Sequence, residues 1–175
     1  MKKLAITLLA VVGLATTFTA CKKEDNAAAD LMQDQAFITA ASSNNLFEMA
    51  AANIALSKTT NTNIKAFANN MLTYYGQATT DMQILARQKQ LDVAESMPQQ
   101  YFDKLTTLNA LADTAFNTQY VALMVTSHQQ SVNLYTSASQ NAVKDEGIKA
   151  FAAAKLPALK QQLEAATALK TQVGQ

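Results

Sequence analysis

Apolar side chains recur along most of this chain at alternating steps of three and four residues. That spacing places them on one face of an α-helix, and such a face is expected to pack into a core. Turn-forming and helix-capping residues divide the pattern into four long helices, predicted at 34–57, 61–90, 113–141 and 146–171. Four helices of about 25 residues, each ~38 Å long, predict an all-α four-helix bundle over residues 34–172.

A short helix is predicted between the second and third long helices, from Pro98 to about Leu111, because proline suits a first helical turn. The whole connection, 91–112, could reach ~50 Å if part of it is extended. It is therefore long enough to cross the bundle and to set the second and third long helices parallel. A simple up-down-up-down bundle is the alternative.

Two residues disfavour the helices in which they are predicted. Gly76 falls in the middle of the second long helix, where glycine costs about 1 kcal/mol relative to alanine. A close helix neighbour is the expected reason for this glycine. Pro157 falls inside the last helix and is expected to kink it, because proline lacks the backbone N–H that the helix needs.

The first 33 residues depart from the helical pattern. Two lysines, an apolar run and then small residues follow in the order of a secretory signal. The segment 18–21, Phe-Thr-Ala-Cys, resembles a bacterial lipobox with Phe18 where leucine is usual. The resemblance implies a lipoprotein signal peptide over 1–20 and lipidation of Cys21 on its sulfur and nitrogen. The residues that follow, up to 33, are polar and Ala-rich without a sustained apolar period, which predicts a flexible tether over 21–33 that frays into helix toward its end. A plain signal peptide with an incidental cysteine is the alternative.

Lipid on Cys21 would make the membrane the partner of this protein. Each buried methylene contributes ~0.8 kcal/mol, so two or three acyl chains form a lasting anchor. We therefore expect a lipid-anchored protein of the outer membrane. Lys23-Glu24-Asp25 resembles a signal that some Gram-negative bacteria use for export to the outer face of that membrane. An ordinary solvated linker is the alternative, so both the periplasmic side and the cell surface stay open.

The charge and the motifs of the chain exclude several functions. Without residues 1–20 the chain keeps 12 of its 14 Lys and Arg and all 13 Asp and Glu, a net charge of about −1 with no basic block. Binding of nucleic acid needs clustered cations, so we expect none. Cys21 is the only cysteine, so no disulfide forms within the chain. The sequence has no Gly-rich phosphate loop, Cys-x-x-Cys motif or nucleophile elbow.

Several segments together resemble the ferritin-like domain of unknown function 4142, which is found in many bacterial envelope proteins. They are Phe37 with Glu48, 67–71, 116–120, His128 with 132–135, and 156–159. The resemblance implies a ferritin-like four-helix bundle with a crossover helix, and it supplies no established activity. The family tends to carry Asp-His at the positions of Tyr74-Tyr75 and Ser127-His128, and histidine at Gln162. Of these inward-facing groups, this chain keeps Glu48 and His128.

Glu48, Tyr75, His128 and Gln162 fall in the inward stripes of the four long helices. We predict a buried polar cluster in which Glu48 pairs with His128, Tyr75 donates its hydroxyl, and Gln162 fills the remaining valences. A position at a bundle end in water is one alternative. A metal site on Glu48 and His128 is the other, but such a site needs three or four good ligands. We therefore expect no catalytic residues, no metal and no cofactor besides the lipid.

Two classes of function remain at this point. The first is a non-enzymatic envelope lipoprotein whose helical bundle binds a partner or supports the cell surface. The alternative is a ferritin-like protein with a degenerate site that binds metal or protects against oxidative stress.

Overall fold

The computed structural model describes residues 21–173, with side chains from residue 28 onward. These residues form five α-helices, joined by short connections and one π-helical turn, and no strand. The elements are α1 (Cys21–Lys58), α2 (Thr62–Lys89), α3 (Gln99–Ala110), α4 (Asp113–Ser137), the π-helical turn η1 (Ala138–Ala142) and α5 (Glu146–Val173). The predicted signal peptide, 1–20, lies outside the described residues. None of the helices over 21–173 is both long enough and apolar enough to cross a membrane.

Polar side chains set the starts of two long helices where the sequence predicted them. Asn61 Oδ1 accepts the backbone N–H groups of Asn63 and Ile64 at 2.9 and 3.1 Å, which caps α2. Asp145 Oδ1 accepts the N–H of Ile148 at 3.0 Å at the start of α5. Each cap satisfies N–H groups that have no partner inside the helix.

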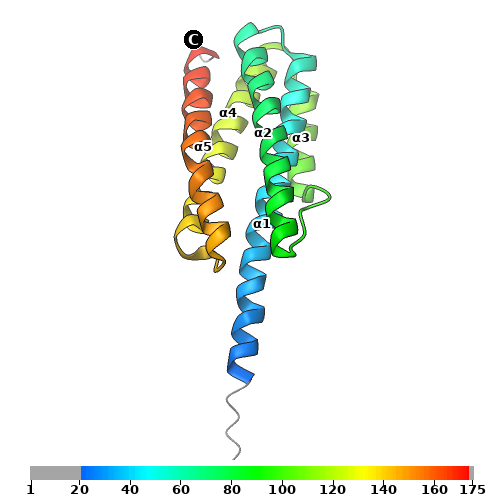
Figure 1. The fold of residues 1–175 in the computed structure, drawn as a ribbon. Coiled ribbons are helices and arrows are strands. Elements are labelled where there is room, and N and C mark those ends of the chain that lie inside the picture. Colours follow the sequence, from blue (N-terminus) through cyan, green and yellow to red (C-terminus); the bar gives the residue numbers. More distant parts are fainter. Residues whose placement is uncertain (1–20, 174–175) are drawn as a thin grey trace, which may run out of the picture.

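The first helix is longer than predicted. α1 already includes Cys21, the first described residue, so residues 21–33, for which we expected a flexible tether with helix only toward its end, are helical. Alanines at 27–29 are the best helix formers, and the helix that packs from Asp34 onward gives this segment a turn to extend. Figure 1 shows this first part of α1 projecting beyond the ends of the other helices. We call residues 21–33 the stalk.

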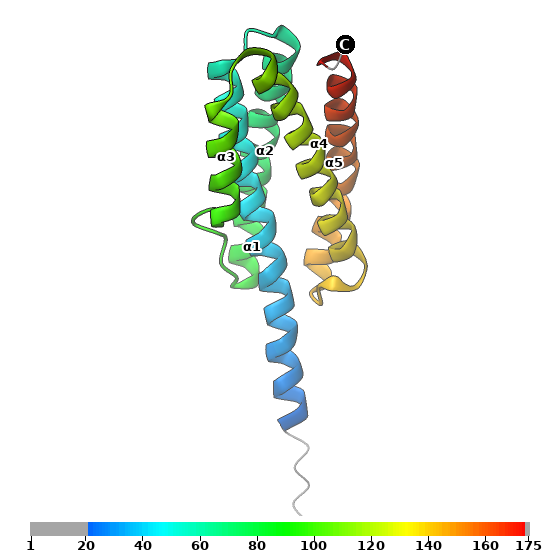
Figure 2. The same cartoon turned by 180° about the vertical axis from the view of Figure 1, so that it is seen from behind.

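The helices form two antiparallel pairs that lie side by side. α1 packs along α2, and α4 packs along α5. α2 and α4 run in the same direction, because α3 carries the chain back between them (Figures 1 and 2). The connection thus crosses the bundle as predicted, and the up-down-up-down alternative for the four long helices is wrong. α3 packs on α1 and α4, with Leu105 and Leu108 buried and Phe102 exposed.

Two apolar clusters fill the interior. One gathers around Phe47, Phe67, Met71, Phe116 and Met124. The other gathers around Phe37, Ile38, Met82, Tyr135 and Ile148. Each large side chain that is fully buried stabilises the fold by ~1.5–3 kcal/mol.

The two helix-disfavouring residues differ in their surroundings. A Cβ built on Gly76 would meet no atom within 4 Å outside its own helix. The expectation of a close helix neighbour is therefore wrong, and packing gives no reason for this glycine. Pro157 lies inside α5, which continues on both sides of it.

Candidate functional site

A layer of buried polar side chains lies between the two apolar clusters. α1 contributes Ser42, Ser43, Asn44, Asn45 and Glu48, and α4 contributes Ser127, His128 and Ser131. We call these eight residues the polar layer. Residues four apart share one face of a helix, and Asn44 and Glu48 on α1 form hydrogen bonds with Ser127 and Ser131 on α4. Ser42 instead accepts the backbone N–H of Ala94 in the α2–α3 connection.

Glu48 and His128 form the centre of the polar layer. Both side chains are 0% exposed, and Glu48 Oε1 lies 3.3 Å from His128 Nδ1. The Ser127 hydroxyl donates to the same carboxylate oxygen. Tyr75 on α2 brings its hydroxyl to within 3.5 Å of His128 Nδ1. A carboxylate removed from water needs such partners, because its lost hydration is otherwise costly.

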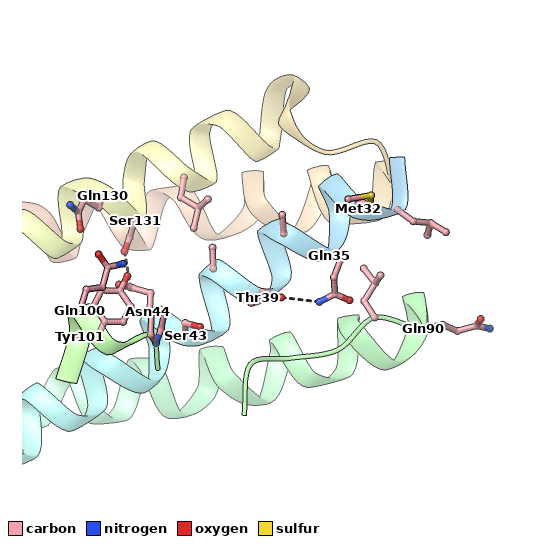
Figure 3. Close-up of a pocket in the computed structure, with 16 residues that line it drawn as sticks. Met32, Gln35, Thr39, Ser43, Asn44, Gln90, Gln100, Tyr101, Gln130 and Ser131 are labelled. Carbon is pink, nitrogen blue, oxygen red and sulfur yellow. Dashed lines mark hydrogen bonds between the residues drawn. The ribbon is translucent and has the colours of Figure 1, made fainter. Parts of the chain in front are cut away.

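Hydrogen bonds continue from this centre toward the surface. The Ser127 hydroxyl lies 3.2 Å from Asn44 Oδ1. Asn44 Nδ2 donates to the Ser131 hydroxyl at 2.9 Å, and that hydroxyl donates to the backbone carbonyl of Ser127 at 3.1 Å. Figure 3 shows Asn44 and Ser131 facing each other across α1 and α4. Glu48 is therefore linked through Ser127 to Asn44 and Ser131.

The polar layer is only partly satisfied by protein groups. Within the described residues, Glu48 Oε2, His128 Nε2, Asn45 Nδ2 and the Tyr120 hydroxyl are buried without a hydrogen-bond partner. Buried polar groups are nearly always paired in folded proteins. The centre of the layer therefore keeps unused hydrogen-bonding capacity on both of its titratable side chains.

Three tyrosines near Glu48 have a raised pKa. Burial, followed by the charge of Glu48, raises the pKa of Tyr75 and of Tyr120 well above the ordinary value. The same two causes, in the same order, raise the pKa of Tyr101 on α3. Tyr101 is only half-buried, and Lys104 Nζ lies 5.4 Å from the centroid of its ring.

The structure brings three of the four predicted cluster residues together and leaves out Gln162. Glu48, Tyr75 and His128 meet as described above. Gln162 is half-buried on α5, and no hydrogen bond of the described side chains involves it. Leu159 and Ala166 carry the buried face of α5, so Gln162 lies at the edge of that face. Cys21 is the first residue of α1, and its side chain is not described.

Sequence reasoning missed the two serines of the layer. Ser127 and Ser131 stand one turn apart around His128, both 3% exposed. Small hydroxyl residues at such a spacing beside an inward-facing histidine were the available signal. Both serines form hydrogen bonds with Asn44, which lies 83 positions before Ser127 and 87 before Ser131. No local pattern in the sequence indicates these bonds.

The chemistry of the layer is that of a structural network. The Ser127 hydroxyl donates to the carboxylate and not to the imidazole, so His128 does not activate it as a nucleophile. A metal would find two donors, Glu48 and His128. Over the residues that the structure describes, no group of three or more His, Cys, Asp or Glu side chains is placed to hold a metal ion, whereas lasting sites use three or four ligands.

A groove of about 980 Å³ opens at the outer end of the hydrogen-bond chain. Its walls come from α1 between Leu31 and Asn44, from the α2–α3 connection, from the start of α3, and from α4 between Gln130 and Leu134 (Figure 3). The connection is held to α1 by Gln35, whose side-chain amide exchanges two hydrogen bonds with the backbone of Asp92, at 2.7 and 2.9 Å. Asn44 and Ser131 belong both to the groove and to the polar layer.

These features define an all-helical bundle with a buried polar layer and a groove beside its first helix. Residues 19–169 match the family described as a domain of unknown function, DUF4142. The match covers most of the 175 residues, and the chain belongs to this family. No curated protein and no solved structure matches the chain.

Proposed function

We propose that this protein is a non-enzymatic helical-bundle module of the outer membrane, anchored by lipid on Cys21, that binds a ligand or partner. The observation that carries the proposal is the stalk. α1 leaves the bundle as a single helix, and Cys21 is its first described residue (Figure 1). Thirteen helical residues span ~20 Å. Lipid on Cys21 would therefore hold the bundle clear of the membrane surface.

The arrangement of the helices supports a ferritin-like bundle within this proposal. The four long helices form two antiparallel pairs, and α3 crosses between the second and third of them. Ferritin-like folds are four-helix bundles with one such crossover connection.

Replacement of Cys21 by serine tests the anchor. The full-length Cys21→Ser chain should lose incorporation of radiolabelled palmitate and should move from the detergent phase to the aqueous phase, because serine offers no thiol for acylation. A Lys22→Ser chain changes the neighbouring residue and should keep both properties. Palmitate labelling that persists in Cys21→Ser would refute the anchor.

A ferritin-like metal protein is the second candidate, and the unpaired Glu48 Oε2 and His128 Nε2 favour it. Metal analysis of protein purified without chelator separates the two candidates. The binding module predicts metal far below one equivalent and a melting temperature that a chelator does not change. About one or two equivalents, lost in His128→Ala, would favour the metal protein instead.

A further inference from the structure

The groove has the length and the volume of a site for one acyl chain. From Met32 to Asn44 it follows α1 for twelve residues, which is ~18 Å of helix rise. A lipid chain spans half of the ~30 Å hydrocarbon core, or ~15 Å. The volume of about 980 Å³ lies within the ~300–1,000 Å³ of small-molecule sites.

The stalk end of the groove carries two large apolar side chains and the exposed amide of Gln90 (Figure 3). Leu31 and Met32 stand at the stalk end, 57% and 73% exposed. The amide of Gln35 at this end is already bonded to Thr39 and to the backbone of Asp92, so it offers little to a ligand.

The inner end of the groove carries hydroxyl and amide groups. Asn44, Gln100, Tyr101, Gln130 and Ser131 gather there from three helices (Figure 3). Gln100 and Gln130 are exposed, so their amides are available as donors and acceptors. A head group with hydroxyls would find several partners at this end.

The charge of the groove selects against an anionic head group. Among the residues whose side chains are described, the 16 that line the groove include no Lys, Arg, Asp or Glu. Lys104 Nζ on α3 lies 5.4 Å from the centroid of the Tyr101 ring, but Lys104 does not line the groove. A carboxylate or phosphate bound within the groove would lose hydration without a cation in the lining to pair with.

We propose that this groove binds one uncharged amphiphile with a single acyl chain, of the monoacylglycerol class. The acyl chain lies along α1 from Met32, and the hydroxyl head meets Gln100, Tyr101 and Gln130. The inference deepens the proposed binding role by naming the class of ligand. It does not require the lipid on Cys21, so the two proposals can fail separately.

Binding is measured by calorimetry on the full-length Cys21→Ser chain, purified without detergent. The probes are 1-lauroylglycerol and laurate at mildly alkaline pH, which share one chain and differ in head-group charge. We expect 1-lauroylglycerol to bind at least about tenfold more tightly than laurate. Equal or tighter binding of laurate, or no binding of 1-lauroylglycerol, would overturn the proposal.

The first variant fills part of the groove with a larger side chain. Ala40 lines the groove on an exposed position of α1, and Ala40→Phe should weaken the binding of 1-lauroylglycerol by about tenfold or more. Ala153→Phe, at an exposed position of α5 outside the groove, is the matched control and should bind as before. Equal weakening in both variants would contradict a site in the groove.

The second variant adds a positive charge at an exposed position and therefore leaves the buried core unchanged. Gln130→Lys adds a cation at the inner end and should strengthen the binding of laurate several-fold. Gln129→Lys, at the neighbouring exposed position outside the groove, should leave laurate binding unchanged. If both lysines act alike, the head group does not lie at the inner end.

Discussion

Glu48 is the residue on which the interior depends most. Its carboxylate is fully buried, and Oε1 joins His128 and Ser127 in one contact. Removing one partner of a buried charged contact leaves the others unpaired, which costs more than the contact itself contributes. The same residue holds α1 to α4, so its loss affects the junction of the two helix pairs.

We expect Glu48→Ala to lower the free energy of unfolding by about 3 kcal/mol, because Ser127 and His128 would lose their shared acceptor. Glu48→Gln keeps an oxygen acceptor and should cost less. Urea denaturation measures both changes. Glu164→Ala, on an exposed position of α5, is the control and should stay within about 0.5 kcal/mol of the wild type. An unchanged urea midpoint in Glu48→Ala would show that the contact contributes nothing.

At the scale of the element, Gly76 lowers the stability of α2, although no neighbouring helix requires a glycine at this position. Gly76 adopts no positive φ, and a Cβ there would meet nothing within 4 Å. Glycine keeps its full entropic cost in a helix interior. The helix is therefore less stable than its packing allows.

Gly76→Ala should raise the free energy of unfolding by about 1 kcal/mol, because alanine lowers the entropy of the unfolded chain and creates no clash. Thermal unfolding followed by circular dichroism measures the shift. Gly147→Ala is the contrasting variant, because its Cβ would lie 2.8 Å from Lys89 Nζ. We expect Gly147→Ala to gain less. A lower melting temperature in Gly76→Ala would mean that α2 needs its glycine for a reason other than space.

At the scale of the whole molecule, two ion pairs join α2 to α5 and so connect the two helix pairs. Lys89 Nζ lies 2.7 Å from Asp145 Oδ1, and Lys155 pairs with Asp81. The hydrogen bond from Lys89 lowers the pKa of Asp145, and the hydrogen bond from Lys155 lowers the pKa of Asp81. The four side chains are less than a third exposed, so each pair contributes at most about 1 kcal/mol after screening by solvent.

These lowered pKa values predict how stability depends on pH. An unfolded aspartate has a pKa of about 3.9, so the contribution is present above that pH and is lost as the pH falls through the lowered folded values. The double variant Asp81→Asn/Asp145→Asn should be less stable than the wild type by about 1 kcal/mol at neutral pH. Asparagine still caps α5, so this difference should vanish in acid and shrink with added salt. Urea denaturation across pH checks both trends, and a difference that persists in acid would contradict them.

Several features of the fold follow from the sequence because they are local. The three-and-four spacing of apolar residues predicted four long helices, and Asn61 and Asp145 begin two of them as expected. Residues 91–112 are long enough to cross the bundle, and α3 does cross it. Only the end of the stalk was expected to be helical, because its alanine-rich sequence has high helix propensity but no repeating apolar face that would indicate a helix.

The sequence predicted only some of the contacts between helices. Periodicity placed Glu48, Tyr75, His128 and Gln162 on inward faces, but a shift of a few ångströms along or around a helix decides which of them touch. The structure joins the first three and leaves Gln162 at an edge. It also brings Asn44 to Ser131 across 87 positions of chain, which no local pattern encodes.

The sequence by itself determined that this chain is helical, where three of its four long helices begin, and that it carries no clustered cations, because each of these depends on neighbouring residues or on composition. Only the tertiary structure decided that the interior is divided by a polar layer and that an uncharged groove opens beside α1. Both arise where α1, α3 and α4 approach one another, and the distances between packed helices set which groups are paired, buried or left open to a ligand.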